Sequence, residues 1–118
     1  MDKKRQLIYF KDYYWDFFNN LTEKVKDKID YVLFLMTVAD QIPSKFFEKI
    51  TGYEGIFAVR VEFESNIYRI FCCFDEGNLI VLFNGFQKKT QKTPKDEIEK
   101  AMKIKEEYFE FKKKEEKK

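Results

Sequence analysis

Residues 55–86 constrain the fold more than any other part of the chain, because they are apolar almost throughout and are interrupted twice by turn-forming residues. The run GIFAVRVEFESNIYRIFCCF is rich in Phe, Val and Ile and alternates in stretches, which predicts a β-hairpin with its turn at residues 64–66. The segment DEGN, residues 75–78, predicts a second turn in which Gly77 is free to take positive φ. The run LIVLFNGF that follows is continuously apolar, which predicts an interior strand buried on both faces.

The segment before this β-rich region carries helical signals. Residues 5–10 predict a first short strand, and Asp12 is suited to cap a following helix that has Trp15 and Phe18 on one face. Thr22 is suited to cap a second helix. Four apolar residues then recur at helical spacing and predict a stripe facing the core: Val25, Ile29, Val32 and Met36.

Three residues predict the start of a last helix: Thr93 as its N-cap, Pro94 in its first turn and Asp96 at the capping-box position. Its predicted inward stripe consists of Ile98, Ala101, Met102, the aliphatic stem of Lys105, and Tyr108. The expected order is β-α-α-β-β-β-α, an α+β fold in which a twisted, mainly antiparallel sheet carries the helices on one face. We expect a single domain over residues 1–111, followed by a charged tail, KKKEEKK at residues 112–118, that frays.

Composition excludes several classes of protein. Of 118 residues, 44% are hydrophobic, which is enough for a core and argues against disorder. The sequence has no run of about 18 apolar residues, so no membrane span is expected, and its polar start indicates no signal peptide. Because there is no histidine, histidine zinc ligands and Ser-His-Asp triads are excluded, and we expect neither metal nor cofactor.

The two cysteines and the net charge say less about function. Cys72 and Cys73 are adjacent and would point to opposite faces of a strand, so we expect reduced, buried thiols in a cytoplasmic protein. The net charge of +2 is the small difference between 23 basic and 21 acidic residues, so partners must be inferred from the distribution of charge instead.

Two arginines stand in the middle of the predicted hairpin, where a charged side chain is costly unless its head reaches water or an anion. Arg60 and Arg69 are expected on a sheet face that the helices leave open. The alternative is that each arginine pairs with a nearby carboxylate, such as Glu62 or Glu54.

A cationic segment, NGFQKKTQKTP at residues 84–94, follows the third strand directly. No acidic residue occurs from position 79 to position 95, and the segment is bounded by a strand and by a capped helix, which predicts a rigid basic rim. Together with the two arginines, this rim predicts a concave basic surface for a polyanion, most commonly nucleic acid. A solvated loop is the alternative for the charge pattern taken alone.

These residues resemble a known family. The sequence from about residue 52 to residue 108 is similar to the RelE/HigB toxins of bacterial type II toxin–antitoxin systems, and most of all to the phage-derived HigB branch. That pattern has a Gly-(Leu/Ile)-Tyr-Glu-(Leu/Val)-Arg stretch, a Tyr-Arg pair on the next strand, and Gly-Phe-x-Lys-Lys-Thr-x-Lys-Thr-Pro before an amphipathic helix.

The resemblance implies a ribosome-dependent mRNA endonuclease that cuts messages in the ribosomal A site and so inhibits translation. Carried over by motif, Arg60, Arg69 and Lys89 are the catalytic candidates. Four further residues are candidates for binding RNA: Lys88, Lys92, Thr90 and Phe86. The implied partners are the ribosome and mRNA, and a helix-turn-helix antitoxin through which any contact with DNA would be indirect. We expect acidic antitoxin residues near Lys88 and Lys89.

The sequence departs from the pattern at one place, where Phe57-Ala58 replaces the usual Tyr-Glu. The missing carboxylate could serve as a base or orient the hairpin arginine, so its loss suggests a toxin attenuated at Ala58, either naturally or by design. The remaining alternative is a non-catalytic inhibitor on the same fold, resembling the ParE branch that is associated with gyrase, or a module that only binds a partner.

Overall fold

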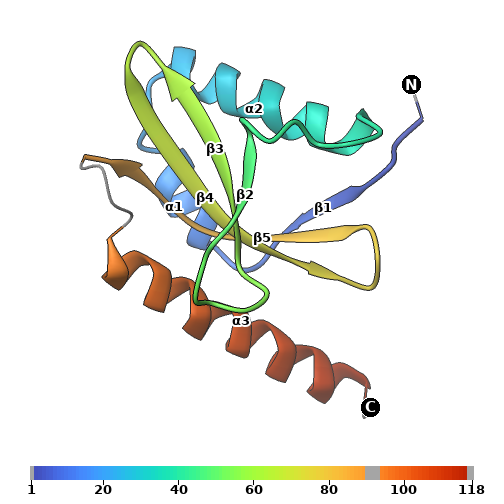
Figure 1. Ribbon diagram of the computed structural model, residues 1–118. Helices are drawn as coiled ribbons and strands as arrows, with labels where there is room; N and C mark the ends of the chain where they lie inside the picture. The colour runs from blue at the N-terminus through green and yellow to red at the C-terminus, as the bar shows by residue number, and fades with distance from the viewer. Residues whose placement is uncertain (1, 90–93, 117–118) are drawn as a thin grey trace.

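The computed structural model describes residues 2–89 and 94–116, and Figure 1 shows its helices packed around one sheet. In chain order its elements are β1 (Gln6–Tyr9), α1 (Tyr13–Phe18), α2 (Glu23–Val38), β2 (Phe47–Lys49), β3 (Phe57–Phe63), β4 (Asn66–Asp75), β5 (Leu79–Lys88) and α3 (Lys95–Glu116). The sheet order is β1-β5-β4-β3-β2, with β1 parallel to β5 and the other pairs antiparallel. The predicted α+β class and mainly antiparallel sheet are therefore confirmed.

The β3-β4-β5 meander follows the apolar pattern of the sequence. Glu64 and Ser65 form the hairpin turn with φ of 48° and 69°, which gives two successive residues of positive φ as in a type I′ connection. Gly77 has a φ of 78° in the second turn, as predicted. The predicted interior strand is also confirmed, because β5 lies between β1 and β4 and four of its residues are fully buried: Ile80, Val81, Leu82 and Phe83.

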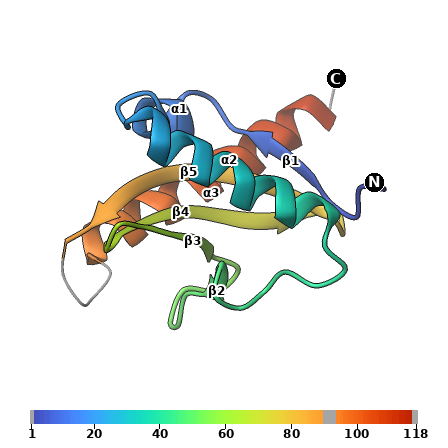
Figure 2. The same ribbon diagram turned by 90° about the horizontal axis from the view of Figure 1, so that it is seen from above.

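The sheet carries helices on both faces, so the expectation that all helices share one face is wrong. Figure 1 places α2 above the sheet and α3 below it, and Figure 2 shows α2 in front of the strands and α3 behind them. Two separate cores follow from this arrangement. One contains Ile29 of α2 with Val59 and Ile70 of the sheet, and the other contains Ala101 of α3 with Phe71. The physical reason is that β4 is apolar on both faces, so each face needs a cover.

The helix signals predicted α2 well. Thr22 is its N-cap, with Oγ1 accepting a hydrogen bond from the amide of Val25 at 3.4 Å. All four predicted core residues of α2 are buried: Val25, Ile29, Val32 and Met36. In α1 the residue that faces the core is Tyr14, which is 1% exposed, whereas Trp15 is 36% exposed.

Strand β2 was absent from the predicted order. Its three residues pair antiparallel with β3 in the register Phe47 with Val59, Glu48 with Ala58, and Lys49 with Phe57. Three residues are too few to show a periodic pattern in sequence. This strand makes β3 an interior strand at position 58, so Ala58 has neighbours on both sides.

Helix α3 continues to Glu116, past the boundary at residue 111 expected from the charged tail. Lys112 lies 2.8 Å from a carboxylate oxygen of Asp75 and 2.9 Å from one of Glu76. The hydroxyl of Tyr108 donates to the same Asp75 carboxylate at 2.7 Å. These contacts anchor α3 to the β4–β5 turn as far as Lys112, the first residue of the segment where composition predicts fraying.

Gly85 of β5 lies directly under an aromatic ring of α1. A Cβ built on Gly85 would meet the ring of Phe17 at 2.5 Å, closer than side chains can pack. We expect Gly85→Ala to lower the free energy of unfolding by about 1–3 kcal/mol, since the ring or helix α1 must shift. Urea unfolding followed by circular dichroism measures this change.

Its matched control makes room for the new methyl group. In a Phe17→Leu background the same Gly85→Ala substitution is expected to cost less, because the added methyl group then meets a smaller side chain. Equal costs in the two backgrounds would show that the contact with Phe17 is not the reason for glycine at this position.

Candidate functional site

Arg60 and Arg69 lie directly opposite each other on β3 and β4, and Phe86 of β5 is the next residue in the same row. Lys88 lies one row further on, on the same face, opposite Ile67. The sheet register therefore brings together four of the seven predicted site residues. We refer to Arg60, Arg69, Phe86 and Lys88 as the arginine cluster.

The arginine cluster lies on the α3 face of the sheet, just beyond the start of that helix. Near its start, α3 contacts Asn84 of β5, whose side-chain amide donates to the backbone carbonyl of Glu97 at 3.3 Å. From there α3 runs toward Asp75, away from Phe86. The prediction of an entirely uncovered face was therefore wrong, but the arginines occupy the end of the α3 face that the helix does not reach.

Each arginine has a carboxylate partner. Arg60 lies 3.4 Å from Glu62 on its own strand, which confirms that part of the alternative. Arg69 forms an ion pair with Glu48 of β2, a residue that the sequence analysis did not single out. Glu54 instead uses its backbone carbonyl, which accepts from Lys105 at 3.1 Å. Two arginines opposite each other repel, and the two carboxylates offset that repulsion.

Arg69 is the buried member of the cluster. Its side chain is 7% exposed, against 30% for Arg60, and burial lowers the pKa of Arg69. Among the described residues, Nε of Arg69 has no hydrogen-bond partner. A buried guanidinium with an unused donor has capacity for a further anion, since buried donors normally find an acceptor.

Lys88 is the lysine that the fold places beside the arginines. Desolvation lowers the pKa of Lys88, and the positive charges of Arg69 and Arg60 lower it further. Lys89 follows β5 and is exposed, and the structure shows no contact between it and the arginines within the described part of the chain. The predicted RNA-binding residues Thr90 and Lys92, and the predicted N-cap Thr93, lie outside the described residues.

Phe86 is half-buried and rests on the core. Its ring stacks on Phe71 with centroids 5.6 Å apart and planes 23° apart. Phe71 is fully buried, so core packing occupies it and it is not accessible to a base. Only the face of Phe86 turned away from Phe71 can meet a ligand.

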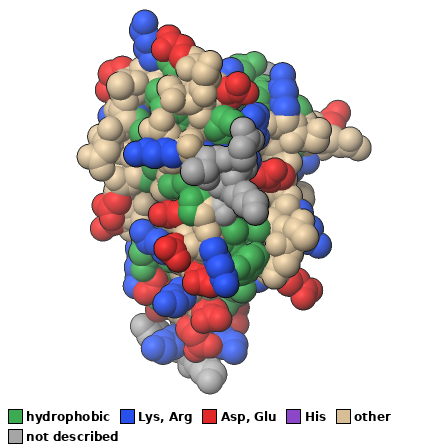
Figure 3. Space-filling view, turned by 60° about the vertical axis from the view of Figure 1, so that its left-hand side comes forward, with side chains coloured by type: hydrophobic (Ala, Val, Ile, Leu, Met, Phe, Trp, Pro, Cys, Tyr) green, Lys and Arg blue, Asp and Glu red, His purple; other side chains and the backbone are tan. Residues whose placement is uncertain are grey.

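A hollow of about 270 Å³ adjoins Arg60. It is lined by Lys28 of α2, by Lys45 and Phe46 of the segment before β2, and by Arg60 and Glu62. Lys28 and Lys45 could not be predicted as site residues from the sequence, because only the packing of α2 and of the segment before β2 beside β3 brings them near Arg60. Cations and carboxylates are interspersed at this site, as they are on the face shown in Figure 3, so the surface is not the purely basic one expected.

A comparison with protein families matches residues 16–106 to the family described as phage-derived protein Gp49-like (DUF891). The chain belongs to this family. Gp49-like proteins are a HigB-like toxin family of the RelE/ParE superfamily, which confirms the resemblance seen in the sequence. A search of curated proteins finds no match to the chain.

The matched range of this Gp49-like protein includes every residue of the arginine cluster and its two carboxylate partners. RelE-like toxins are typically endoribonucleases, and membership in a toxin family implies an antitoxin partner. At the position where the resemblance predicts a carboxylate, Ala58 is fully buried and lies directly opposite Glu48 on β2.

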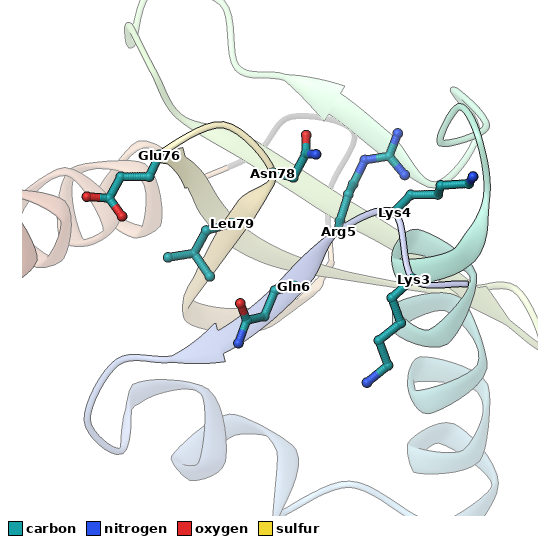
Figure 4. A pocket seen from close by; sticks show the side chains of 7 residues that line it. All are labelled: Lys3, Lys4, Arg5, Gln6, Glu76, Asn78 and Leu79. Carbon is teal, nitrogen blue, oxygen red and sulfur yellow. The ribbon is translucent and has the colours of Figure 1, made fainter. Parts of the chain in front are cut away.

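A second pocket of this Gp49-like protein, of about 510 Å³, lies at the other end of β5, where Leu79 contributes to its lining. Figure 4 shows its seven side chains, and those of Lys3, Lys4 and Glu76 point in different directions. Arg5 is already engaged there, since its guanidinium donates to the carbonyls of Met36, Ala39 and Asp40 at the end of α2. This pocket therefore offers no convergent set of chemical groups.

Two features are absent from residues 2–89 and 94–116. No helix among them has the length and apolar character needed to cross a membrane. The same residues contain no group of three or more Cys, Asp or Glu side chains placed to hold a metal ion.

Proposed function

We propose that this Gp49-like protein is a ribosome-dependent mRNA endonuclease, the toxin of a type II toxin–antitoxin pair. The observation that carries the proposal is the arginine cluster: a buried guanidinium with an unused donor, a second arginine beside it, and a lysine of lowered pKa, all on one face of a HigB-like fold. Such a group of cations suits the charge that develops on a phosphodiester during cleavage.

The chemistry proposed is attack of a ribose 2′-oxygen on the adjacent phosphorus. The 2′-oxygen loses its proton and bonds to phosphorus, the bond from phosphorus to the 5′-oxygen breaks, and that oxygen takes up a proton. Arg69 and Arg60 would stabilise the negative charge on the phosphorane. We assign proton transfer to Lys88 rather than Lys89, since Lys88 lies beside the arginines, and burial together with Arg69 and Arg60 lowers its pKa and so favours the neutral amine.

The hollow beside Arg60 would hold a neighbouring phosphate of the message. Lys28, Lys45 and Arg60 line it from three different segments, so a backbone phosphate placed there would meet several cations at once. Such contacts make binding weaken as salt concentration rises. They would also place the message in a fixed register relative to Arg69.

The function is tested by primer extension on a reporter mRNA in a translation extract, with and without the purified protein. New 5′ ends that appear only on translated messages are the expected result. Cleavage of untranslated RNA to the same extent would contradict the role of the ribosome. Absence of cleavage, together with inhibition of gyrase supercoiling, would establish the ParE-like alternative instead.

The proposed partners are the ribosome, the message and a helix-turn-helix antitoxin in the cytoplasm, and we expect acidic antitoxin residues beside Lys88 and Lys89. Replacing both lysines by Glu is expected to weaken antitoxin binding by at least about 10-fold, because opposite charges become like charges. Calorimetric titration measures this, with Lys100→Glu on the exposed surface of α3 as the charge-matched control. Unchanged affinity in the Lys88→Glu, Lys89→Glu protein would rule out this contact.

A further inference from the structure

Glu48 is the carboxylate that the structure pairs with the buried arginine. It lies on β2, two strands away from Arg69 on β4, and its side chain is 40% exposed whereas that of Arg69 is 7% exposed. The partner of Arg60 is different, since Glu62 lies two residues along the same strand. Arg69 therefore depends for its position on a residue from a strand only three residues long.

The two side chains meet across β3 at Ala58. The register places Glu48 opposite Ala58, and Ala58 opposite Phe71, two residues from Arg69 on the same face. Ala58 is fully buried although it has only a methyl side chain, so neighbouring groups cover it. A small residue at this position leaves space for a long side chain from β2 and another from β4 to reach each other.

We propose that Glu48 is the positioning residue of the cleavage site: it fixes the Arg69 guanidinium where the scissile phosphate binds, and Ala58 is the small residue that lets the two meet. This inference rests on the proposed function. It assigns to Glu48 the orienting carboxylate that is missing at position 58. The protein is then not attenuated by Ala58, because the carboxylate is supplied by the neighbouring strand.

The ion pair has two physical consequences for the reaction. A buried arginine without a partner would be destabilised and would turn toward water, so Glu48 keeps Arg69 in one orientation. Glu48 also balances the charge of the guanidinium without using all of its donors, because Nε and Nη1 have no hydrogen-bond partner among the described residues. Arg69 is thus held in place while it retains a donor for phosphate, which is the arrangement that preorganised catalysis requires.

The test compares the turnover of folded protein with its binding to translating ribosomes. Glu48→Gln is expected to lower kcat for cleavage of a translated message by about 10- to 100-fold, the scale of a misplaced catalytic group. KM is expected to stay equal or to fall, because the protein gains positive charge toward RNA. Glu110→Gln, which makes the same charge change at an exposed position of α3, is the matched control.

Moving the carboxylate from β2 to β3 distinguishes a role of Glu48 in positioning Arg69 from a role in stabilising the fold. In Glu48→Ala/Ala58→Glu the new carboxylate lies on the strand next to Arg69, a diagonal neighbour within reach of long side chains. We expect this protein to recover kcat to within about 5-fold of the wild type, whereas Glu48→Ala alone does not. A folded double variant with no recovery overturns the inference, as does a Glu48→Gln protein whose kcat per folded molecule equals that of the wild type.

If the Glu48→Ala/Ala58→Glu protein does not fold, a double-mutant cycle tests whether Glu48 acts through Arg69. Positioning through Arg69 predicts that Glu48→Gln adds less than about 3-fold to the loss caused by Arg69→Lys, since the two act as one unit. Fully multiplicative losses overturn the inference. A wild-type protein that cleaves no message overturns the proposed function, and the inference falls with it. A wild-type protein that cleaves, together with a Glu48→Gln protein that cleaves equally well, overturns the inference alone.

Discussion

Arg69→Ala is expected to lower the rate of mRNA cleavage on translating ribosomes by about 10²- to 10³-fold, the usual cost of removing one preorganised transition-state donor. Arg69 is the buried cation of the cluster, and its Nε has no partner among the described residues. In a dry environment a charge acts on a developing anion more strongly than it does in water. Primer extension against time, at saturating protein, measures the loss.

The control for this prediction removes a positive charge elsewhere. Lys100→Ala, on the exposed surface of α3, is expected to cleave at a rate within about 2-fold of the wild type, as surface substitutions usually do. Thermal unfolding of the Arg69→Ala protein must show that it is folded at the assay temperature, since Glu48 then loses its partner. A folded Arg69→Ala protein that cleaves normally would remove Arg69 from the site.

Periodic pattern was sufficient to predict most of the fold. The alternating and continuous apolar runs predicted β3, β4 and β5, and the spacing of Val25, Ile29, Val32 and Met36 predicted the buried face of α2. These elements are long enough for the period of burial to show in the sequence. The placement of α3 on the second face was not predicted, because a continuous apolar strand indicates that both faces are covered without indicating which helix covers each.

The candidate site was predictable only where its residues lie in strands that are neighbours in the chain. Arg60 and Arg69 share a hairpin, so their register follows from the turn at Glu64 and Ser65. Glu48 reaches the site through a strand of three residues, and Lys28 through the packing of α2 against the sheet. No local pattern marks either residue, because their role depends on contacts between distant segments.

The roles of the two adjacent lysines also could not be predicted from local sequence. The motif made Lys88 and Lys89 equivalent in sequence, and Lys89 was the one predicted to be catalytic. The register of β5 separates them, because Lys88 lies on the face of Arg69 and Phe86 while Lys89 follows the strand. This placement gives Lys88 its own chemistry, because burial and the two arginines lower its pKa.

Phe71→Ala is expected to lower the free energy of unfolding by about 3–5 kcal/mol, the usual cost of truncating a fully buried phenylalanine. Phe71 is 0% exposed, packs in the α3 core and carries the ring of Phe86. For a domain of this size the loss corresponds to a fall in Tm of about 10–20 °C. Differential scanning calorimetry measures it directly, and Phe34→Ala, at a residue 49% exposed, is expected to change stability by less than about 1 kcal/mol.

Phe71 also connects the core to the arginine cluster, which makes its effect on cleavage informative. Phe71→Leu keeps a large apolar side chain and is expected to cost clearly less than Phe71→Ala, which leaves a larger cavity under Phe86. If the packing of Phe71 holds the row of Arg60, Arg69 and Phe86 in place, the Ala variant loses cleavage beyond its unfolded fraction and the Leu variant does not. Equal cleavage by the folded fractions of the two variants would mean that the sheet register alone positions the cluster, because the strand pairing of Arg60 with Arg69 does not depend on the side chain at position 71.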